Sequence, residues 1–126
     1  MHKFRSGSEQ RLWSLLKESK IKHRYEPYKI KYHVSLIRSY LPDFVLTNGI
    51  ILEVKGRFTT ADRQKHLYIR REEPLLDIRF IFDNPKSKLY KGSKTTYADW
   101  CEKNNFLYCS AKDSDLILKW CNEKSD

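Results

Sequence analysis

Cysteine, proline, glycine and long apolar runs are all scarce in this sequence. The 126 residues include three cysteines, four prolines and four glycines. The cysteines, Cys101, Cys109 and Cys121, lack C-x-x-C spacing, which disfavours a zinc knuckle or a redox pair, and we expect buried free thiols. No apolar run is long enough for a transmembrane helix, and the first residues lack the apolar stretch of a signal peptide. We therefore expect a cytoplasmic protein with a single domain over residues 1–126.

Positive charge is what the sequence has in excess. Lys and Arg number 25 against 16 Asp and Glu, which gives a formal net charge of +9. The isoelectric point near 9.5 favours a polyanionic partner, with nucleic acid first and an anionic membrane surface second. A membrane surface is the weaker candidate because no segment combines a basic face with a broad apolar one. Hydrophobic residues make up 40%, which argues against disorder.

Periodicity and capping signals predict a mixed α/β fold. Helices are expected over residues 6–19, 59–71 and 113–121, with another that begins at Thr96. Strands are expected over residues 23–32, 44–46, 50–55, 76–82 and 106–109. A basic loop is expected over residues 84–94.

An acidic and a basic side chain occur together on an otherwise apolar strand. Because side chains alternate along a strand, Glu53 and Lys55 share one face and Leu52 and Val54 share the other. Charge on a buried face is costly, and a divalent metal ion would account for it. Asp43, ten residues before Glu53, supplies a second carboxylate, and the lysine would orient or deprotonate a metal-polarised water. The alternative is a solvated strand face with an ordinary Glu–Lys pair.

The turn between the two strands decides whether the carboxylates meet. A two-residue turn would pair Phe44 with Glu53 and send Asp43 to the opposite face. A three-residue turn over residues 47–49 pairs Asp43 with Glu53, and it needs a left-handed residue where Gly49 stands. We predict the three-residue turn.

Several further side chains have both a functional and a structural interpretation. Glu9 is the N3 partner of a capping box that begins at Ser6, and this structural role is the better one on the residues alone; the alternative is a third catalytic carboxylate. Basic residues of one helix and one loop could grip phosphates, although a solvated face explains each one singly. They are Arg63, Lys65, His66 and Arg70 on the helix, and Lys86, Lys88, Lys91 and Lys94 in the loop.

A colinear series of motifs extends over about residues 4–104. It comprises Phe4-Arg5-Ser6-Gly7-x-Glu9, Pro42-Asp43-Phe44-x-Leu46-x-Asn48-Gly49-Ile50, Glu53-x-Lys55-Gly56, Asp62-Arg63-x-Lys65-His66-Leu67-x-Ile69-Arg70, Leu76-Asp77-Ile78-Arg79, Lys88-Leu89-Tyr90-Lys91-Gly92-Ser93 and Cys101-Glu102-Lys103. In these motifs the sequence resembles the phage endonuclease I family, the four-way (Holliday) junction resolvases of the restriction-endonuclease-like PD-(D/E)xK superfamily.

The resemblance implies a fold, a reaction and a set of site residues. It implies a mixed β-sheet flanked by helices, and metal-dependent hydrolysis of branched DNA in the cytoplasm of an infected bacterium. Asp43, Glu53 and the Val54 carbonyl would bind Mg²⁺, or Mn²⁺ in its place, with two ions per site and no small-molecule cofactor. Lys55 would serve the attacking water, and Glu9 would become a catalytic acid or a metal-shell residue. Arg5 and Arg57 would join the DNA contacts.

The resemblance also implies an intertwined homodimer. The N-terminal helix and strand would be exchanged through a bridge within residues 32–41. Each active site would then combine Glu9 of one chain with Asp43, Glu53 and Lys55 of the other. Two alternatives stay open: a sequence-biased endonuclease of the homing or restriction type on the same core, and a non-catalytic protein that binds DNA junctions.

Overall fold

The chain separates into two compact units, Met1–Ile37 and Arg38–Asp126. The computed structural model describes Phe4 and residues 6–125, so the predicted DNA contact Arg5 lies outside the described residues. The boundary between the units falls inside residues 32–41, where the family resemblance places a bridge. The single domain and the exchanged bridge stay predictions.

The first unit is built on helix α1 (Gly7–Glu18). The Ser6 side chain accepts a hydrogen bond from the Glu9 N–H at 3.1 Å, so the helix begins where the capping signal predicts. A capping box also requires the Glu9 carboxylate to accept the Ser6 N–H. That part of the prediction is wrong, because the Glu9 carboxylate accepts a hydrogen bond from the Tyr25 hydroxyl instead. The ring of Phe4 packs edge-on against Tyr25, with centroids 5.0 Å apart.

The strand predicted over residues 23–32 is wrong, since the structure has no strand in that segment of the described chain. The alternation that suggested it leaves Tyr28, Ile30 and Tyr32 exposed by 68%, 77% and 82%. Glu26 also takes a φ of 45°, which interrupts an extended backbone. A strand needs a neighbour to accept its N–H groups, and periodicity alone does not supply one.

The second unit contains a mixed sheet, which has four strands within the described residues. In order across the sheet they are β1 (Phe44–Val45), β2 (Ile51–Lys55), β3 (Ile78–Phe82) and β4 (Tyr108–Ser110). Strand β1 is antiparallel to β2, whereas β2, β3 and β4 run parallel. The predicted mixed α/β fold is therefore confirmed. The last predicted strand begins two residues late, because Phe106 turns into the core instead.

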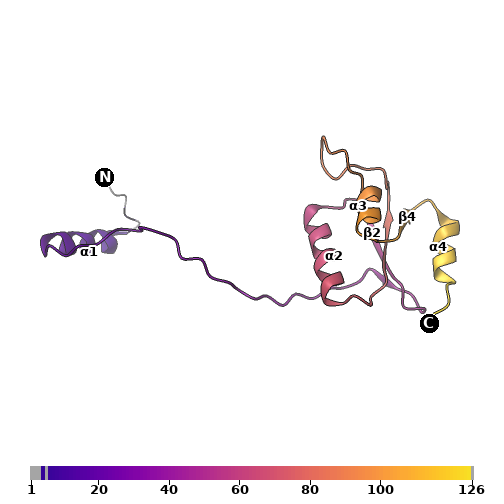
Figure 1. Ribbon diagram of the computed structural model, residues 1–126, viewed down its shortest axis with the longest axis horizontal. Helices are drawn as coiled ribbons and strands as arrows, with labels where there is room; N and C mark the ends of the chain where they lie inside the picture. The colour runs from indigo at the N-terminus through magenta and orange to yellow at the C-terminus, as the bar shows by residue number, and fades with distance from the viewer. Residues whose placement is uncertain (1–3, 5, 126) are drawn as a thin grey trace. The chain divides into compact units, whose positions relative to one another are not determined.

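Helices cover both faces of this sheet (Figure 1). Helices α2 (Thr60–Glu72) and α3 (Tyr97–Lys103) lie against one face, and α4 (Ser114–Cys121) lies against the other. Both α2 and α3 begin with a complete capping box, which explains why their starts were readable from the sequence. None of the helices formed by the described residues is long and apolar enough to cross a membrane.

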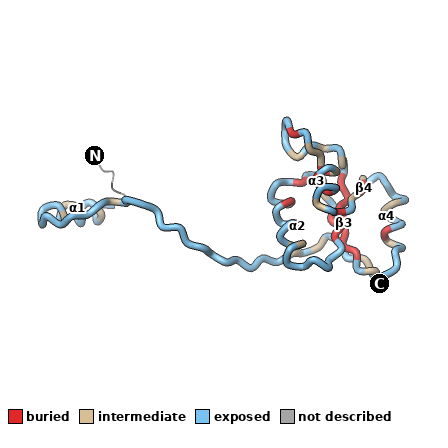
Figure 2. The backbone as a smooth tube through the Cα atoms, viewed as in Figure 1, coloured by how far each residue is buried: buried red, intermediate tan, exposed pale blue. Residues whose placement is uncertain are grey.

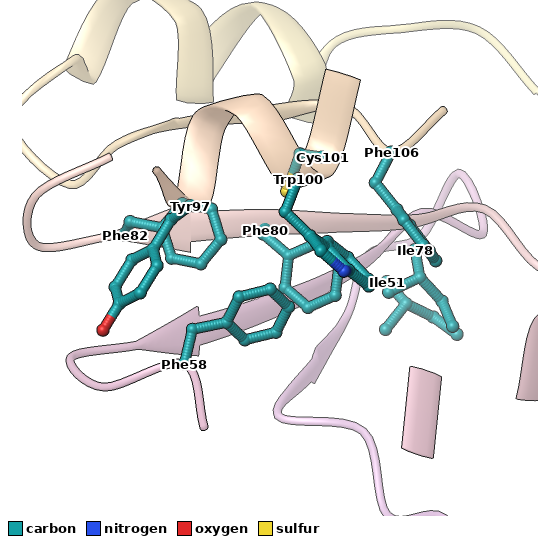
Figure 3. Close-up of a cluster of buried hydrophobic side chains, with 9 residues drawn as sticks. All are labelled: Ile51, Phe58, Ile78, Phe80, Phe82, Tyr97, Trp100, Cys101 and Phe106. Carbon is teal, nitrogen blue, oxygen red and sulfur yellow. The ribbon is translucent and has the colours of Figure 1, made fainter. Parts of the chain in front are cut away.

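The core is densest around β3, which is buried along its whole length (Figure 2). An aromatic cluster fills the face under α3, with Phe58, Phe80 and Phe82 at 1% exposure or less (Figure 3). On the opposite face Trp120 of α4 closes a smaller cluster. The three cysteines are free, as predicted; Cys101 and Cys109 are also buried as predicted, whereas Cys121 is only half-buried. Burial raises the pKa of Cys101 to about 12.

The turn between β1 and β2 has three residues, as predicted. Phe44 pairs with Leu52 and Val45 with Ile51, so the same register opposes Asp43 to Glu53. The Leu46 N–H donates to the Ile50 carbonyl at 2.8 Å, which closes the turn. Gly49 has a φ of 91°, a conformation in which a Cβ atom would be strained.

Asn48 ties this turn to the end of α4. Its amide nitrogen donates to the carbonyl oxygens of Trp120 at 2.9 Å and Glu123 at 3.0 Å. Its side-chain oxygen accepts the Ile50 N–H at 3.1 Å. We expect Asn48→Ala to lower the free energy of unfolding by about 2 kcal/mol, as measured by urea denaturation. Thr47→Ala, at an exposed neighbouring position, is the control, and equal losses in both variants would contradict this role.

Arg79 ties β3 to the residues after α4. Its guanidinium pairs with Asp77 at 2.8 Å and with Glu123. The hydrogen bond from Arg79 lowers the pKa of Glu123 below its usual range. The folded protein therefore binds that proton less tightly than the unfolded chain. The stabilisation is complete above the usual glutamate pKa and is lost as the pH falls through the lowered value.

We therefore expect acid to destabilise the parent more steeply than Glu123→Gln. The measurement is the urea midpoint of each protein from about pH 6 down to about pH 3.5. The variant should start at a lower midpoint and lose less of it over this interval. Parallel pH profiles would show that the ion pair contributes nothing.

Candidate active site

Asp43 and Glu53 hold each other across the end of the hairpin. The Asp43 N–H donates to Glu53 Oε2 at 2.8 Å, and the Val54 N–H donates to Asp43 Oδ2 at 2.9 Å. Each carboxylate thus has one oxygen engaged by a backbone N–H. Opposed positions of this type lie about 4.5–5.5 Å apart, close enough for both carboxylates to reach one cation.

Pro42 is the reason that the ladder stops here. It has no N–H, so it cannot extend the pairing of β1 with β2. The Val54 N–H is taken up by the Asp43 carboxylate instead. The N–H and C=O of one strand residue point toward the same neighbour in an antiparallel pair, so the Val54 carbonyl is also directed to the Asp43 side.

Glu53 and Lys55 lie on one strand face, as the alternation predicts, and that face is turned to helix α2. Glu53 Oε1 lies 3.5 Å from His66 Nε2, and Lys55 Nζ lies 3.5 Å from Asp62 Oδ1. Residues 62 and 66 are four apart on one helix and therefore share a face. Asp62 also accepts the Thr59 N–H in the capping box, so its carboxylate is held in place at the start of the helix.

Burial and contacts act in opposite directions on these acids. Burial alone would raise the pKa of Glu53, which is 2% exposed, but the contacts with His66 and with the Asp43 N–H outweigh it. The pKa of Glu53 is therefore lowered, and the group is a carboxylate at neutral pH. The pKa of Asp62 is likewise lowered: burial would raise it, but the Thr59 hydrogen bonds and the Lys55 charge prevail.

Tyr40 closes the site beside His66. Its ring meets the imidazole edge-on, with centroids 5.5 Å apart and an interplanar angle of 85°. Burial raises the pKa of the Tyr40 hydroxyl, and the nearby Glu53 charge raises it further. The ammonium of Lys65, an exposed residue, lies 5.2 Å from the centroid of the same ring. Tyr40 is thus a neighbour of both His66 and the Glu53 carboxylate.

The sequence reasoning missed Tyr40 and Asp62 as members of this site. A usable signal existed for Asp62, because the capping box that starts α2 four residues after Lys55 brings the first helical turn back over β2. No comparable signal marked Tyr40, since its position depends on how residues 38–42 lead into the hairpin.

Two of the predicted DNA contacts do not fit their surroundings. His66 is fully buried, and Arg63 is 9% exposed with its guanidinium donating to the Phe58 carbonyl at 2.6 Å. Neither side chain is placed to reach a phosphate, so both predicted DNA contacts are withdrawn. Arg70 also donates to a backbone carbonyl, that of Asn104, at 2.6 Å and stacks on Phe106. The other predicted contacts described by the structure are exposed: Arg57, Lys65, Lys86, Lys88, Lys91 and Lys94.

A groove of about 630 Å³ lies at the carboxyl ends of β3 and β4. Lys86 and Lys112 line it together with Asp83 and Asn84. The Asp83 N–H donates to the Lys55 carbonyl at 3.3 Å, so the groove begins next to the end of β2. Lys86 and Lys112 therefore lie at the same end of the parallel strands as Lys55.

Glu9 belongs to the other unit. It stands at the third position of α1, half-buried, and its carboxylate is engaged by Tyr25. Asp43, Glu53 and Lys55 lie together in the second unit, whereas Glu9 is part of the first unit. No group of three or more His, Cys, Asp and Glu side chains is arranged to hold a metal ion within the described residues.

The donor set at the hairpin nevertheless suits a hard divalent cation. Mg²⁺ is held in proteins by one or two carboxylates together with water and substrate phosphate oxygens. Asp43 is exposed and Glu53 is kept ionised, and the Val54 carbonyl lies on the same side. The residues present therefore fit the ion.

Comparison with known proteins gives matches along the whole chain. The family model described as phage endonuclease I matches residues 1–126. "Endodeoxyribonuclease 1" of Enterobacteria phage T3 is 47% identical over 106 residues, which cover 83% of this chain and 70% of the relative. "Endonuclease I" of Escherichia phage T7 is 41% identical over 121 residues, which cover 95% of this chain and 79% of the relative.

Proposed function

Because the chain belongs to the phage endonuclease I family and is thus a DNA-cleaving hydrolase, we propose that it resolves four-way junctions and other branched DNA by metal-dependent hydrolysis. The observation that carries the chemistry is the pair of opposed carboxylates with a lysine on the same strand face. Shape-directed recognition suits the exposed lysines, since no motif for reading base edges accompanies them.

Each residue of the hairpin has a defined task in this proposal. Asp43, Glu53 and the Val54 carbonyl would hold a divalent ion, which would supply a polarised water and charge neutralisation at the phosphate. Lys55 would orient the attacking water as an ammonium, or take its proton as the neutral amine, and Asp62 Oδ1 lies 3.5 Å from its nitrogen. Glu53 stays ionised because His66 and the Asp43 N–H favour its carboxylate.

A homodimer would complete the site. The first unit exposes Leu12 and Leu15 by 55% and 57%, and Val34, Leu36 and Ile37 of the following segment by 65% or more. Apolar surface of this extent is expected to be covered by a partner, and a second copy is the candidate. Glu9 of one chain would then join Asp43, Glu53 and Lys55 of the other. Two such sites would cut opposing strands of one junction.

The first test compares a labelled immobile four-way junction with a linear duplex of matching sequence, in Mg²⁺, in Mn²⁺ and in EDTA. We expect paired nicks in the junction, abolished by EDTA, and little cutting of the duplex. Equal cutting of the duplex at one defined sequence would favour the alternative, a sequence-biased endonuclease. Tight binding without cleavage in either metal would favour a non-catalytic junction-binding protein.

The second test addresses the shared site by complementation. Glu9→Gln and Lys55→Ala are each expected to be inactive as homodimers. In a mixed dimer with exchanged N-terminal units, one site combines the intact Glu9 of the K55A chain with the intact Lys55 of the E9Q chain. The other site carries both substitutions. Co-refolding the two variants should therefore restore nicking of a single strand. An inactive mixture, with mixed dimers shown to have formed, would exclude the exchange.

A further inference from the structure

His66 combines deep burial with unsatisfied polar atoms. It is fully buried on α2, and its ring meets Phe80 and Tyr40 edge-on at 4.9 and 5.5 Å. Among the described residues, its two ring nitrogens are buried polar atoms without a hydrogen-bond partner. Leaving such a group unpaired costs on the order of 1–3 kcal/mol. A residue needed only to fill this space would have an apolar side chain.

The polar atom that His66 faces belongs to the candidate site. Its Nε2 lies 3.5 Å from Oε1 of Glu53, which is 2% exposed. The other carboxylate oxygen, Oε2, is held by the Asp43 N–H at 2.8 Å. The two oxygens of Glu53 therefore face two different groups, the Asp43 N–H and the His66 ring.

We propose that His66 is a positioning residue that orients the Glu53 carboxylate for metal ligation through an Nε2–H donor. The inference rests on the proposed function, since Glu53 needs orienting only if it binds a metal. The contact is long for a hydrogen bond in the structure. Catalytic contacts are often long before the ligand binds and tighten when it draws the carboxylate into place. Partners behind the ligands hold metal sites in this way.

The fold explains why α2 supplies the donor. Asp62 and His66 stand one turn apart and meet Lys55 and Glu53, which stand two residues apart on β2. One face of one helix therefore contacts both chemically active side chains of the strand. The side chain of His66 cannot itself reach DNA from this position, which is why we withdrew it from the DNA contacts.

The test uses His66→Gln and His66→Asn in the full chain. The glutamine amide places a donor near the position of Nε2, whereas the asparagine amide ends near the position of Nδ1. Mn²⁺ binding is measured by isothermal titration calorimetry, and stability is measured by urea unfolding without metal. We expect H66N to bind Mn²⁺ at least about tenfold more weakly than the parent, and H66Q to stay within about threefold.

Several results would overturn the proposal. Parent-like Mn²⁺ affinity in H66N would show that the donor is not needed. Equal weakening in H66N and H66Q would show that packing and not the donor matters. If H66N does not fold, His66→Phe keeps the ring, and it should fold as stably as the parent yet bind Mn²⁺ at least about tenfold more weakly; undiminished binding in H66F would refute the role. Failure of the proposed function differs from all of these, because the parent itself would then bind no Mn²⁺.

Discussion

Lys55→Ala is expected to lower the rate of junction cleavage by about a thousandfold while it changes junction affinity by no more than a few-fold. Lys55 stands at the carboxyl end of β2, beside the edge where Asp43 and Glu53 meet. Its side chain is 18% exposed and lies against Asp62, so its ammonium is held near the carboxylates and not spread into solvent. Removing it takes away the group that serves the water and leaves the metal ligands in place.

The measurement is single-turnover cleavage of a labelled junction, with affinity measured separately by gel shift in Ca²⁺. Lys103→Ala, an exposed lysine in the last turn of α3, is the matched control and should cleave at the parent rate. Lys55→Arg distinguishes the two roles, because a guanidinium keeps the charge but cannot exchange a proton near neutral pH. Substantial activity in K55R would favour orientation of the water over proton transfer. Parent-like cleavage by K55A would remove Lys55 from the site.

Phe80→Ala is expected to lower the free energy of unfolding of the second unit by about 3–5 kcal/mol. Phe80 is fully buried at the centre of the aromatic cluster (Figure 3). Its ring packs against Phe58 and Phe106 at centroid distances of 5.0 and 5.2 Å, and it stacks on Phe82. Small domains are stable by only about 5–15 kcal/mol, so this loss should leave the unit close to unfolding.

Urea denaturation followed by tryptophan fluorescence measures the effect, since Trp100 stacks on Phe106 in the same cluster. Leu75→Ala is the control, because Leu75 is 98% exposed and its removal should change stability by less than about 0.5 kcal/mol. Phe80 also contacts His66, so the variant should weaken Mn²⁺ binding along with stability. A loss below about 1 kcal/mol would show that the cluster repacks around the cavity.

Local signals in the sequence predicted most of the second unit. The capping boxes at Thr59 and Thr96 marked the starts of α2 and α3, because the bonds involved link residues three apart. The three-residue turn with Gly49 set the pairing of Asp43 with Glu53, since turn length fixes the register of a hairpin. The shared face of Glu53 and Lys55 followed from strand alternation alone.

The sequence did not predict the structure correctly where a local pattern was compatible with several different contacts. Residues 23–32 alternate like a strand but find no neighbouring strand within the described chain. Glu9 fits a capping box, yet Tyr25 engages its carboxylate. Arg63 and His66 are residue types common on a DNA-facing helix, but the helix turns both side chains inward.

The sequence by itself determined the elements, the hairpin register and the acid–acid–lysine pattern, because each depends on residues close along the chain. Only the tertiary structure decided which side chains surround that pattern. The packing of α2 across β2 brought Asp62 to Lys55 and His66 to Glu53, and it buried the imidazole that the sequence had assigned to DNA. Burial and long-range contact depend on how elements far apart in sequence pack together, and periodicity carries no record of that arrangement.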